Sequence, residues 1–303
     1  MTSTTTTSSE TEPATASPAP AIIIGAGRSG TNMLRDLLVA LPEFSTWPCD
    51  EINYIWRYGN RAFETDEFTR EMANPDSVKY IRGQFEAQRR KHPKKTLVEK
   101  TCASSLRCGF IHEIFPNAKF VHIIRDGRDV AASAALRWNA SLDIGYLLKK
   151  ARFVPKSDLF YYASSYFKAR VHKLTSGKSR LSTWGPKFEG MQQAFTDNSL
   201  PVACAIQWQR CVDAAATQLN ELPTEQVMTI RYEAFTQNPA EEFEKVCQFL
   251  GSQPPKETID ELVKAVSNRS VGKWRKQLND QEVSEIRRLV GDQLDQLGYG
   301  EQA

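Results

Sequence analysis

The pattern of hydrophobic positions predicts a repeated unit of one strand followed by one helix. The apolar run AIII at 21–24 leads through a glycine-rich turn into MLRDLLVAL at 33–41, whose apolar positions have helical spacing. The same order returns in KFVHII at 119–124 and RDGRDVAASAALRW at 125–138. Because parallel strands need long crossover connections, this alternation predicts a mostly parallel sheet that is flanked by helices on both faces.

Further elements follow from the same reasoning. TLVEK at 96–100 predicts a strand, and the helical pattern after it stops before Pro116. The segment LPEFSTWPCDEINYIWR at 41–57 is interrupted by two prolines and predicts a functional loop rather than a strand. The other predicted elements are a helix through 205–219, a strand at 227–232, helices near 239–250 and 257–266, and a helix over about 280–297 capped by Asn279 or Asp280.

Length and composition fit one α/β domain with a tail and an insertion. The chain has 303 residues, of which 41% are hydrophobic and 25% charged, as in ordinary globular proteins. Residues 1–20 hold no Lys, no Arg and no apolar run, so they predict a disordered tail and match neither a secretory signal nor an Arg-rich transit peptide. We expect the domain to span 21–303, with a helical insertion at 139–200.

Charge is distributed unevenly along the chain. The net charge of +3 is too small to indicate binding to nucleic acid. Residues 141–190 nevertheless carry ten Lys or Arg against three Asp or Glu, and they are rich in Tyr and Phe. This composition favours a lid over an acceptor site within 139–200, although a solvated pair of amphipathic helices has the same composition.

The remaining composition argues against a metal site and a membrane span. The four His and six Cys show neither metal-ligand spacing nor a C-x-x-C pair, so we expect reduced cytosolic thiols and no bound metal. No apolar run approaches the roughly 20 residues that a membrane helix requires. We therefore expect a cytoplasmic protein, and the sequence does not determine its oligomeric state.

The glycine-rich turn at 25–31 fits two common nucleotide templates only in part. As a dinucleotide fingerprint it needs a second strand that ends in an acidic residue about 20 positions later, and the segment before Asp50 and Glu51 is a poor strand. As an ATP or GTP P-loop it needs a Lys followed by Ser or Thr, where this chain has Thr31 and Asn32. Both interpretations are therefore disfavoured.

What distinguishes this turn is a cation inside it. Arg28 is followed by Ser29, Gly30 and Thr31, so a guanidinium, two hydroxyls and backbone N–H groups can face a terminal oxyanion at a helix N-terminus. A second turn, within VHIIRDGRDVAAS at 121–133, carries an Arg at the end of a strand and a Ser eight residues later. Such a pair can converge on one phosphate.

These two segments resemble the nucleotide signatures of sulfotransferases that use 3′-phosphoadenosine 5′-phosphosulfate (PAPS). Three further segments are similar and occur in the same order: LVEKT at 97–101, IRYEAFTQNPAEEFEKVCQFLG at 230–251 and SVGKWRKQL at 270–278. The resemblance implies a single P-loop-like α/β domain that transfers a sulfuryl group and releases 3′-phosphoadenosine 5′-phosphate (PAP). It is closer to the carbohydrate, tyrosylprotein and bacterial types, which have a Glu base, than to the cytosolic phenol type, which has a His base.

The resemblance also implies which residues contact PAPS. The implied contacts with the 5′-phosphosulfate are Arg28, Ser29, Gly30, Thr31 and Asn32. The implied contacts with the 3′-phosphate are Arg125, Ser133, Lys273 and Trp274. Tyr232 matches a residue that often lies near adenine, and a buried tyrosine at a strand end fits that position equally well.

Catalysis needs a base for the acceptor and positive charge on the transferring group, and no metal. By resemblance Arg28 and Lys100 supply the charge, and Glu51 is the base, with Asp50 as the second choice. Glu99 competes, but strand alternation places it opposite Lys100, so we expect it to pair structurally, with an Arg as one candidate partner. The acceptor is a hydroxyl or amine on a small or carbohydrate-like molecule.

Three positions depart from the family pattern. Asn32 replaces a second Thr, Met33 stands where some relatives stack a Trp on adenine, and Cys102 replaces a proline and so puts the turn there in doubt. Two other functions stay open: a nucleotide-dependent kinase with an atypical loop, and a nucleotide-binding protein without turnover.

Overall fold

A sheet of five parallel strands, in the order β2-β3-β1-β4-β5, forms the centre of the molecule. The computed structural model describes residues 19–93, 95–138, 155 and 185–300. The strands are β1 (Ala21–Ile24), β2 (Phe44–Thr46), β3 (Thr96–Lys100), β4 (Lys119–Ile124) and β5 (Val227–Arg231). The mostly parallel sheet predicted from the alternating pattern is confirmed.

Helices connect the strands and cover the sheet. The α-helices of the described chain are α1 (Thr31–Ala40), α2 (Asn53–Trp56), α3 (Pro75–Arg89), α4 (Cys108–Ile114), α5 (Gly127–Trp138), α8 (Met191–Asp197), α9 (Leu200–Leu219), α10 (Tyr232–Gln237), α11 (Pro239–Leu250), α12 (Lys256–Val263), α13 (Trp274–Gln277) and α14 (Asp280–Gln296). Short 3-10 helices span Arg70–Met72, Cys102–Leu106 and Thr224–Gln226. The side chain of Asn279 caps α14 in a capping box with Glu282, which decides between the two predicted caps.

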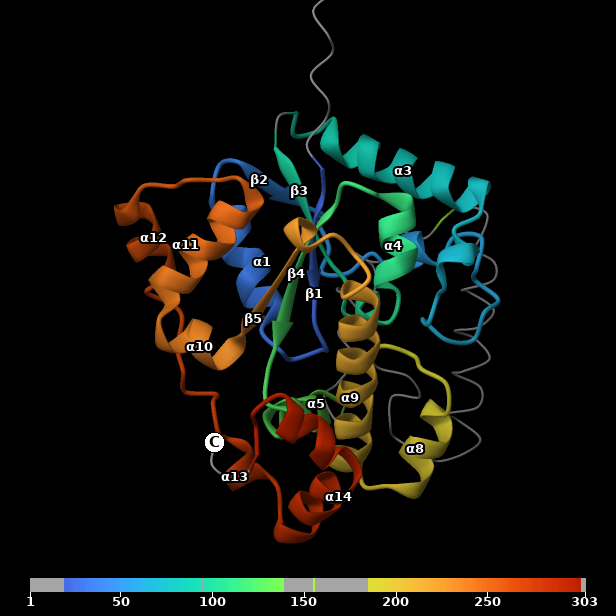
Figure 1. The fold of residues 1–303 in the computed structure, drawn as a ribbon, viewed down its shortest axis with the longest axis vertical. Coiled ribbons are helices and arrows are strands. Elements are labelled where there is room, and N and C mark those ends of the chain that lie inside the picture. The colour runs from blue at the N-terminus through green and yellow to red at the C-terminus, as the bar shows by residue number, and fades with distance from the viewer. Residues whose placement is uncertain (1–18, 94, 139–154, 156–184, 301–303) are drawn as a thin grey trace, which may run out of the picture.

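Alternate residues of each strand pack into separate cores. Ile22 and Ile24 of β1 face the core that includes residues of α3 and α4. Ala21 and Ile23 face the opposite core, which α1, α11 and α12 complete. Figure 1 shows α11 and α12 on one side of the sheet and α4 and α9 on the other. Burial of both faces explains why the strands read as continuous apolar runs.

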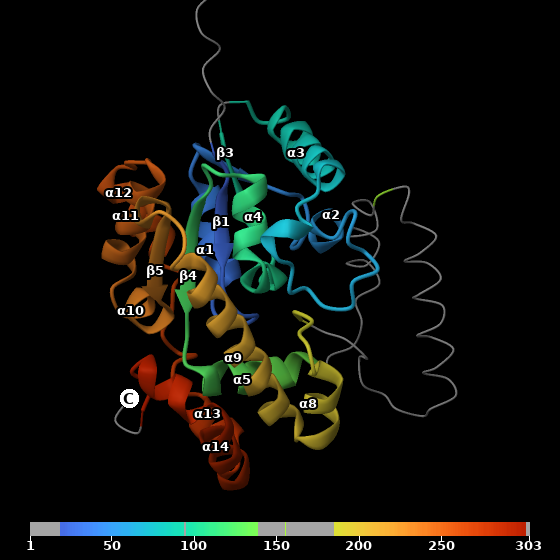
Figure 2. The same cartoon turned by 45° about the vertical axis from the view of Figure 1, so that its right-hand side comes forward.

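A third core lies beyond the carboxyl ends of the strands. It joins α5, α9 and α14 through side chains such as Trp138, Trp208 and Val290. Figure 2 shows α5, α13 and α14 grouped at this end of the sheet. The turns that follow β1 and β4 therefore meet the C-terminal segment here, at the edge of a parallel sheet where ligands usually bind.

The loop predicted at 41–57 contains a strand, so that prediction was wrong. Phe44–Thr46 form β2, which pairs with β3 at the edge of the sheet. Phe44 is buried in the core, and Thr46 donates a side-chain hydrogen bond to the carbonyl of Val98 at 2.8 Å. Three residues are too few to show a periodic pattern, and the pairing partner lies far away in the sequence.

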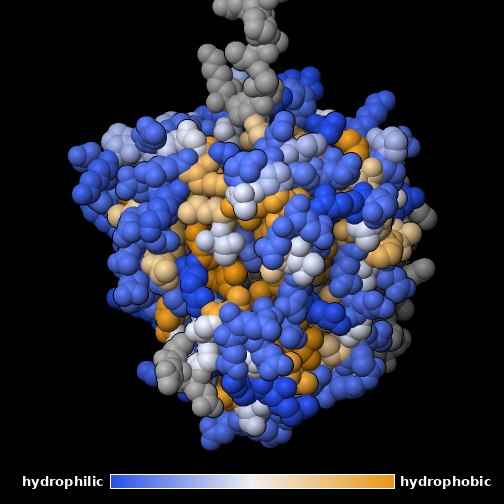
Figure 3. Space-filling view, in the orientation of Figure 1, coloured by the Kyte–Doolittle hydropathy of each residue, from blue (hydrophilic) through white to orange (hydrophobic). Residues whose placement is uncertain are grey.

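Two expectations fall mostly outside the described chain. The predicted tail at 1–20 is described only for residues 19 and 20, and the predicted lid at 139–200 only for residues 155 and 185–200, which include α8. Within the described residues, no helix combines the length and apolar character needed to cross a membrane. Figure 3 shows a mainly hydrophilic surface on one face, with apolar residues exposed between the helices at its centre.

Candidate active site

The turn after β1 is held in a conformation that glycine favours. Gly30 has φ of +96° and caps the N-terminus of α1. A Cβ atom at Gly30 would lie 2.5 Å from Cδ2 of Tyr232, so the turn and the Tyr232 ring are in direct contact. Ser29 is buried, and its N–H donates to the carbonyl of Ala26 at 3.1 Å. The missing side chain at Gly30 therefore lets the Tyr232 ring pack directly against the turn.

Arg28 has an unusual backbone conformation for a residue with a side chain. Its φ is +76°, the one positive φ among non-glycine residues of the described chain. Its Nε donates to Oγ of Ser133 at 3.0 Å, which joins two residues that the sequence assigns to opposite ends of the nucleotide. Burial, followed by the charges of Arg125 and Arg137, lowers the pKa of Arg28 from its ordinary value. Strained residues of this kind cluster at functional sites.

Arg125, at the end of β4, connects the first turn to the C-terminal segment. Its Nη1 donates to the carbonyl of Arg28 at 3.0 Å, and its Nη2 to the carbonyl of Ser270 at 2.6 Å. The guanidinium also lies 4.4 Å above the ring of Tyr232. Its buried Nε has no hydrogen-bond partner within the described chain. The guanidinium therefore keeps one donor that no group of the described chain satisfies.

The residues after Arg125 form a network of contacts around the turn and the start of α5. Arg128 pairs with Asp126 at 2.8 Å. Asp129 accepts hydrogen bonds from the N–H groups of Gly272 at 2.7 Å and Trp274 at 2.9 Å. It also lies 3.7 Å from Nη2 of Arg125. Asp129 thus draws the C-terminal loop against the start of α5.

Trp208 and Trp274 are both buried, and each contacts another group of the protein. Trp208 is buried, and its Nε1 donates to the carbonyl of Arg125 at 3.1 Å. Trp274 is also buried, and its ring lies 4.2 Å from the guanidinium carbon of Arg128. The indole of Trp274 supports the loop and is not part of the cavity wall, whereas Lys273 beside it is.

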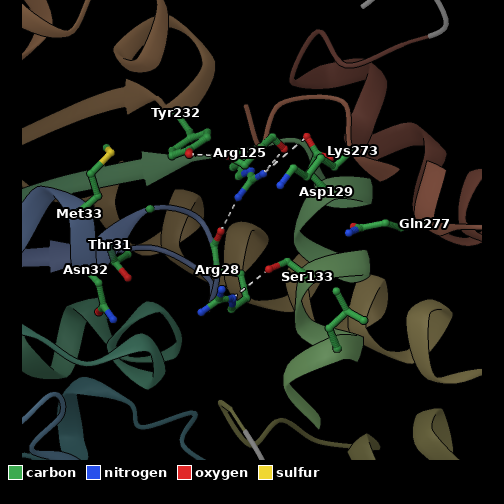
Figure 4. Close-up of a pocket in the computed structure, with 13 residues that line it drawn as sticks. Arg28, Thr31, Asn32, Met33, Arg125, Asp129, Ser133, Tyr232, Lys273 and Gln277 are labelled. Carbon is green, nitrogen blue, oxygen red and sulfur yellow. Dashed lines mark hydrogen bonds and ion pairs between the residues drawn. The ribbon is translucent and has the colours of Figure 1, made fainter. Parts of the chain in front are cut away.

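These segments enclose a cavity of about 380 Å³ at the carboxyl ends of β1 and β4. Figure 4 shows Arg28, Arg125 and Ser133 directed toward one another across it. The lining residues are Arg28, Gly30, Thr31, Asn32, Met33, Arg125, Asp129, Ser133, Leu136, Tyr232, Ser270, Lys273 and Gln277. Three of these are cationic, and the single carboxylate, on Asp129, is occupied by backbone N–H groups. The cavity therefore suits a ligand with several negative charges.

Four of the lining residues, Asp129, Leu136, Ser270 and Gln277, were not among the predicted contacts, and Met33 was named only as a departure from the family pattern. Ser270 begins a segment that was quoted for its resemblance, and its Oγ lies 2.7 Å from the hydroxyl of Tyr232. Leu136 lies three positions after Ser133 on α5, and Gln277 lies four positions after Lys273 on α13. Helical spacing from a predicted contact was the signal available for these last two.

A second polar cluster joins β3 to the loop after β2. Lys100 is buried, and its Nζ lies 3.1 Å from Oδ1 of Asp50 and 3.5 Å from Oε1 of Glu51. Burial opposes the charge on Lys100, but the carboxylates of Glu51 and Asp50 outweigh it and raise its pKa. Asp50 also pairs with Arg35 at 2.5 Å. Burial opposes ionisation of Asp50, but the charges of Lys100 and Arg35 prevail and lower its pKa.

The position where the family pattern has proline gives this chain an extra donor. Cys102 begins a short 3-10 helix, and its N–H donates to Oε1 of Glu51 at 3.3 Å. A proline has no N–H and offers no such bond. Burial first, then the neighbouring Glu51, raises the pKa of the Cys102 thiol to about 12, so the thiol is neutral. Glu51 is thereby held by Lys100 and a backbone N–H.

Glu99 lies on the opposite side of β3 from Lys100, as strand alternation predicts. It is fully buried, and its Oε1 accepts a hydrogen bond from Oγ1 of Thr101 at 2.6 Å. Burial raises its pKa to about 7, although Thr101, Trp56 and Arg107 favour the charged form. The expected structural pairing is thus with Thr101, and Arg107 contributes through its charge.

The buried Glu99 carboxyl predicts a pH dependence of stability. Between its ordinary pKa of 4.5 and its folded pKa of about 7, the folded protein holds a proton that the unfolded chain has released. The free energy of unfolding of wild type therefore falls, relative to that of Glu99→Gln, as the pH rises from about 5 to about 8. Urea unfolding of both proteins at these two pH values measures the difference. A difference that stays constant with pH contradicts the burial of an ionisable carboxyl.

Comparison with known proteins agrees with the fold described above. A family model described as a sulfotransferase family matches residues 20–181 and 170–255. The sulfotransferase domain from the curacin biosynthetic pathway superposes with a TM-score of 0.55 at 14% identity, covering 93% of this chain and 98% of that one. Sulfotransferase STF9 from Mycobacterium avium superposes with a TM-score of 0.53 at 10% identity, covering 92% of this chain and 76% of that one. The search of curated proteins found no match. At these identities the structural likeness establishes the fold alone.

Proposed function

This chain belongs to the sulfotransferase family, and from that premise we propose that it transfers a sulfuryl group from PAPS to a hydroxyl or amine of an acceptor, releasing PAP. The observation that carries the proposal is the cavity at the ends of β1 and β4, where Arg28, Arg125 and Lys273 converge. A nucleotide with phosphate groups at both ends needs cations from separate segments of the chain. These three residues come from three such segments.

The unpartnered Nε of Arg125 supports binding of the 3′-phosphate. A buried charged donor without an acceptor is costly, and a phosphate oxygen removes that cost. Ser133 and Lys273 line the same cavity. The turn from Arg28 to Asn32 offers backbone N–H groups at the N-terminus of α1 to the 5′-phosphosulfate. Binding there exchanges the bond between Arg28 and Ser133 for bonds to the ligand.

For the chemical step we assign complementary roles to three residues. Arg28 and Lys100 place positive charge where the transferring group and the bridging oxygen gain negative charge. Glu51 accepts the acceptor's proton, since Asp50 is engaged by two cations that lower its pKa. The charge of Asp50 also acts on Arg28, so the second cluster adjoins the phosphate turn. Transfer is in line, which requires no covalent intermediate with the protein.

Thermal stability tests the nucleotide assignment directly. PAP is expected to raise the melting temperature far more than adenosine 5′-phosphate, which lacks the 3′-phosphate, and more than ATP or NADH. A ligand that binds only the native state at about 100 times its Kd stabilises by about 2.7 kcal/mol. Arg125→Met is expected to remove most of the difference between PAP and adenosine 5′-phosphate.

Three results of this comparison have different consequences. Equal shifts with PAP and adenosine 5′-phosphate contradict the proposal that PAPS is the sulfuryl donor. A larger shift with ATP and magnesium indicates a kinase. A PAP-specific shift without transfer from labelled PAPS to any of a broad set of hydroxyl and amine acceptors indicates a nucleotide-binding protein without turnover.

A further inference from the structure

We propose that Thr101 is a positioning residue that holds Glu51 in place by fixing the backbone of Ile52. The inference rests on the function proposed above, because it concerns the base of that reaction. Thr101 itself is fully buried behind the site, so it acts through the loop that carries Glu51 and not on a substrate.

A directed chain of hydrogen bonds links the loop to the strand. The N–H of Ile52 donates to Oγ1 of Thr101 at 3.1 Å, and Oγ1 of Thr101 donates to Oε1 of Glu99 at 2.6 Å. Thr101 Oγ1 accepts the N–H of Ile52 through a lone pair, which leaves its own hydrogen free to point at Glu99. All three residues are buried to within 1% of their surface, so water does not compete for these bonds.

The other side of the same strand end holds the Glu51 side chain. Lys100 and the N–H of Cys102 both contact Oε1 of Glu51, at 3.5 Å and 3.3 Å. Thr101, itself bonded to Glu99, thus binds the loop backbone on one side, while Lys100 and the N–H of Cys102 bind the carboxylate on the other. Neither set of contacts is enough alone, because Ile52 is adjacent to Glu51 and a shift of its peptide moves the carboxylate away from its partners. Misplacement of a reacting group by about 1 Å can cost 10²-fold in rate.

A separate anchor keeps the rest of this region folded when Thr101 is changed. Arg107 is fully buried, and its Nη2 donates to Oδ1 of Asn53, the first residue of α2, at 2.6 Å. Its Nη1 lies 3.7 Å from Oδ1 of the buried Asp66. Removing the Thr101 hydroxyl therefore loosens the loop at Ile52 without releasing α2.

Thr101→Val and Thr101→Ser form the matched pair that tests the proposal. Valine keeps the shape of threonine but neither accepts from Ile52 nor donates to Glu99, so we expect kcat to fall about 10- to 100-fold. Serine keeps the hydroxyl and is expected to restore turnover close to wild type. The PAP-induced shift in melting temperature is expected to be the same in all three proteins, because the turn from Arg28 to Asn32 is unchanged. Should Thr101→Val fail to fold, Thr101→Ala gives the same comparison.

A double-mutant cycle with Glu51→Gln separates positioning of the base from a general structural effect. If Thr101 acts through Glu51, Thr101→Val has little further effect on kcat once Glu51 is glutamine. A loss in the double variant equal to the product of the two single losses overturns the proposal, as does normal turnover of Thr101→Val. Wild-type protein that transfers no sulfuryl group from PAPS instead overturns the proposed function, and the role of Thr101 with it.

Discussion

Glu51→Gln is expected to lower kcat about 10²- to 10⁴-fold while PAP affinity changes little. Glutamine has the same size and still accepts the N–H of Cys102 and faces Lys100, so the loop keeps its contacts. It has no basic oxygen, however, and cannot take the acceptor's proton. Single-turnover transfer from labelled PAPS, together with PAP binding by calorimetry, measures the two quantities separately.

Asp50→Asn is the matched control for this variant. Asp50 is adjacent to Glu51 and shares its partner Lys100, but it also pairs with Arg35. Its lowered pKa makes it the weaker proton acceptor, so we expect a smaller loss of turnover and a loss of stability from the broken ion pairs. If Asp50→Asn abolishes turnover and Glu51→Gln does not, the base is Asp50.

Arg28→Ala is expected to lower transfer about 10²- to 10³-fold, the usual effect of removing one donor from a charged transition state. The guanidinium extends from the turn after β1, and its Nε donates to Oγ of Ser133. Arg137→Ala is the control, because Arg137 is exposed, contributes to the same local charge and does not line the cavity. Equal losses in both variants indicate an effect of general charge and not a specific contact.

Arg28→Gly adds a test of backbone strain at the same position. Glycine adopts the positive φ of Arg28 without the steric cost that alanine pays, so Arg28→Gly is expected to be more stable than Arg28→Ala by about 1 kcal/mol. Both variants lose transfer equally, since neither has a guanidinium. Chemical unfolding of the pair measures the stability difference, and identical midpoints contradict strain in this turn.

The sequence singled out most of the residues that line the cavity, and it also singled out Lys100, Asp50 and Glu51 of the second cluster. Arg28, Arg125 and Lys273 were recognised because each belongs to a short segment with a distinctive local order of residues. Ser270 was missed as a contact, since its role comes from bonds to Tyr232 and Arg125 across the cavity. The strand β2 was missed because it pairs with β3, which lies far away in the sequence.

The amino-acid sequence by itself determined the features that depend on near neighbours. Continuous apolar runs specify strands buried on both faces, and apolar spacing on the intervening segments specifies the helices that cover them. Alternation along β3 was enough to place Glu99 and Lys100 on opposite sides. The two turns after β1 and β4 follow from the same local order of residues.

Only the tertiary structure decided which distant residues meet. Arg28 contacts Ser133 across 105 positions, and Ile52 contacts Thr101 across 49, because the strand order places β1 between β3 and β4 and places β2 beside β3. No local pattern encodes these contacts, since they arise from burial of several cores at once and from hydrogen bonds between strands far apart in the chain. Within the described residues, the cavity and the cluster of Lys100, Asp50 and Glu51 therefore exist only once the sheet has assembled.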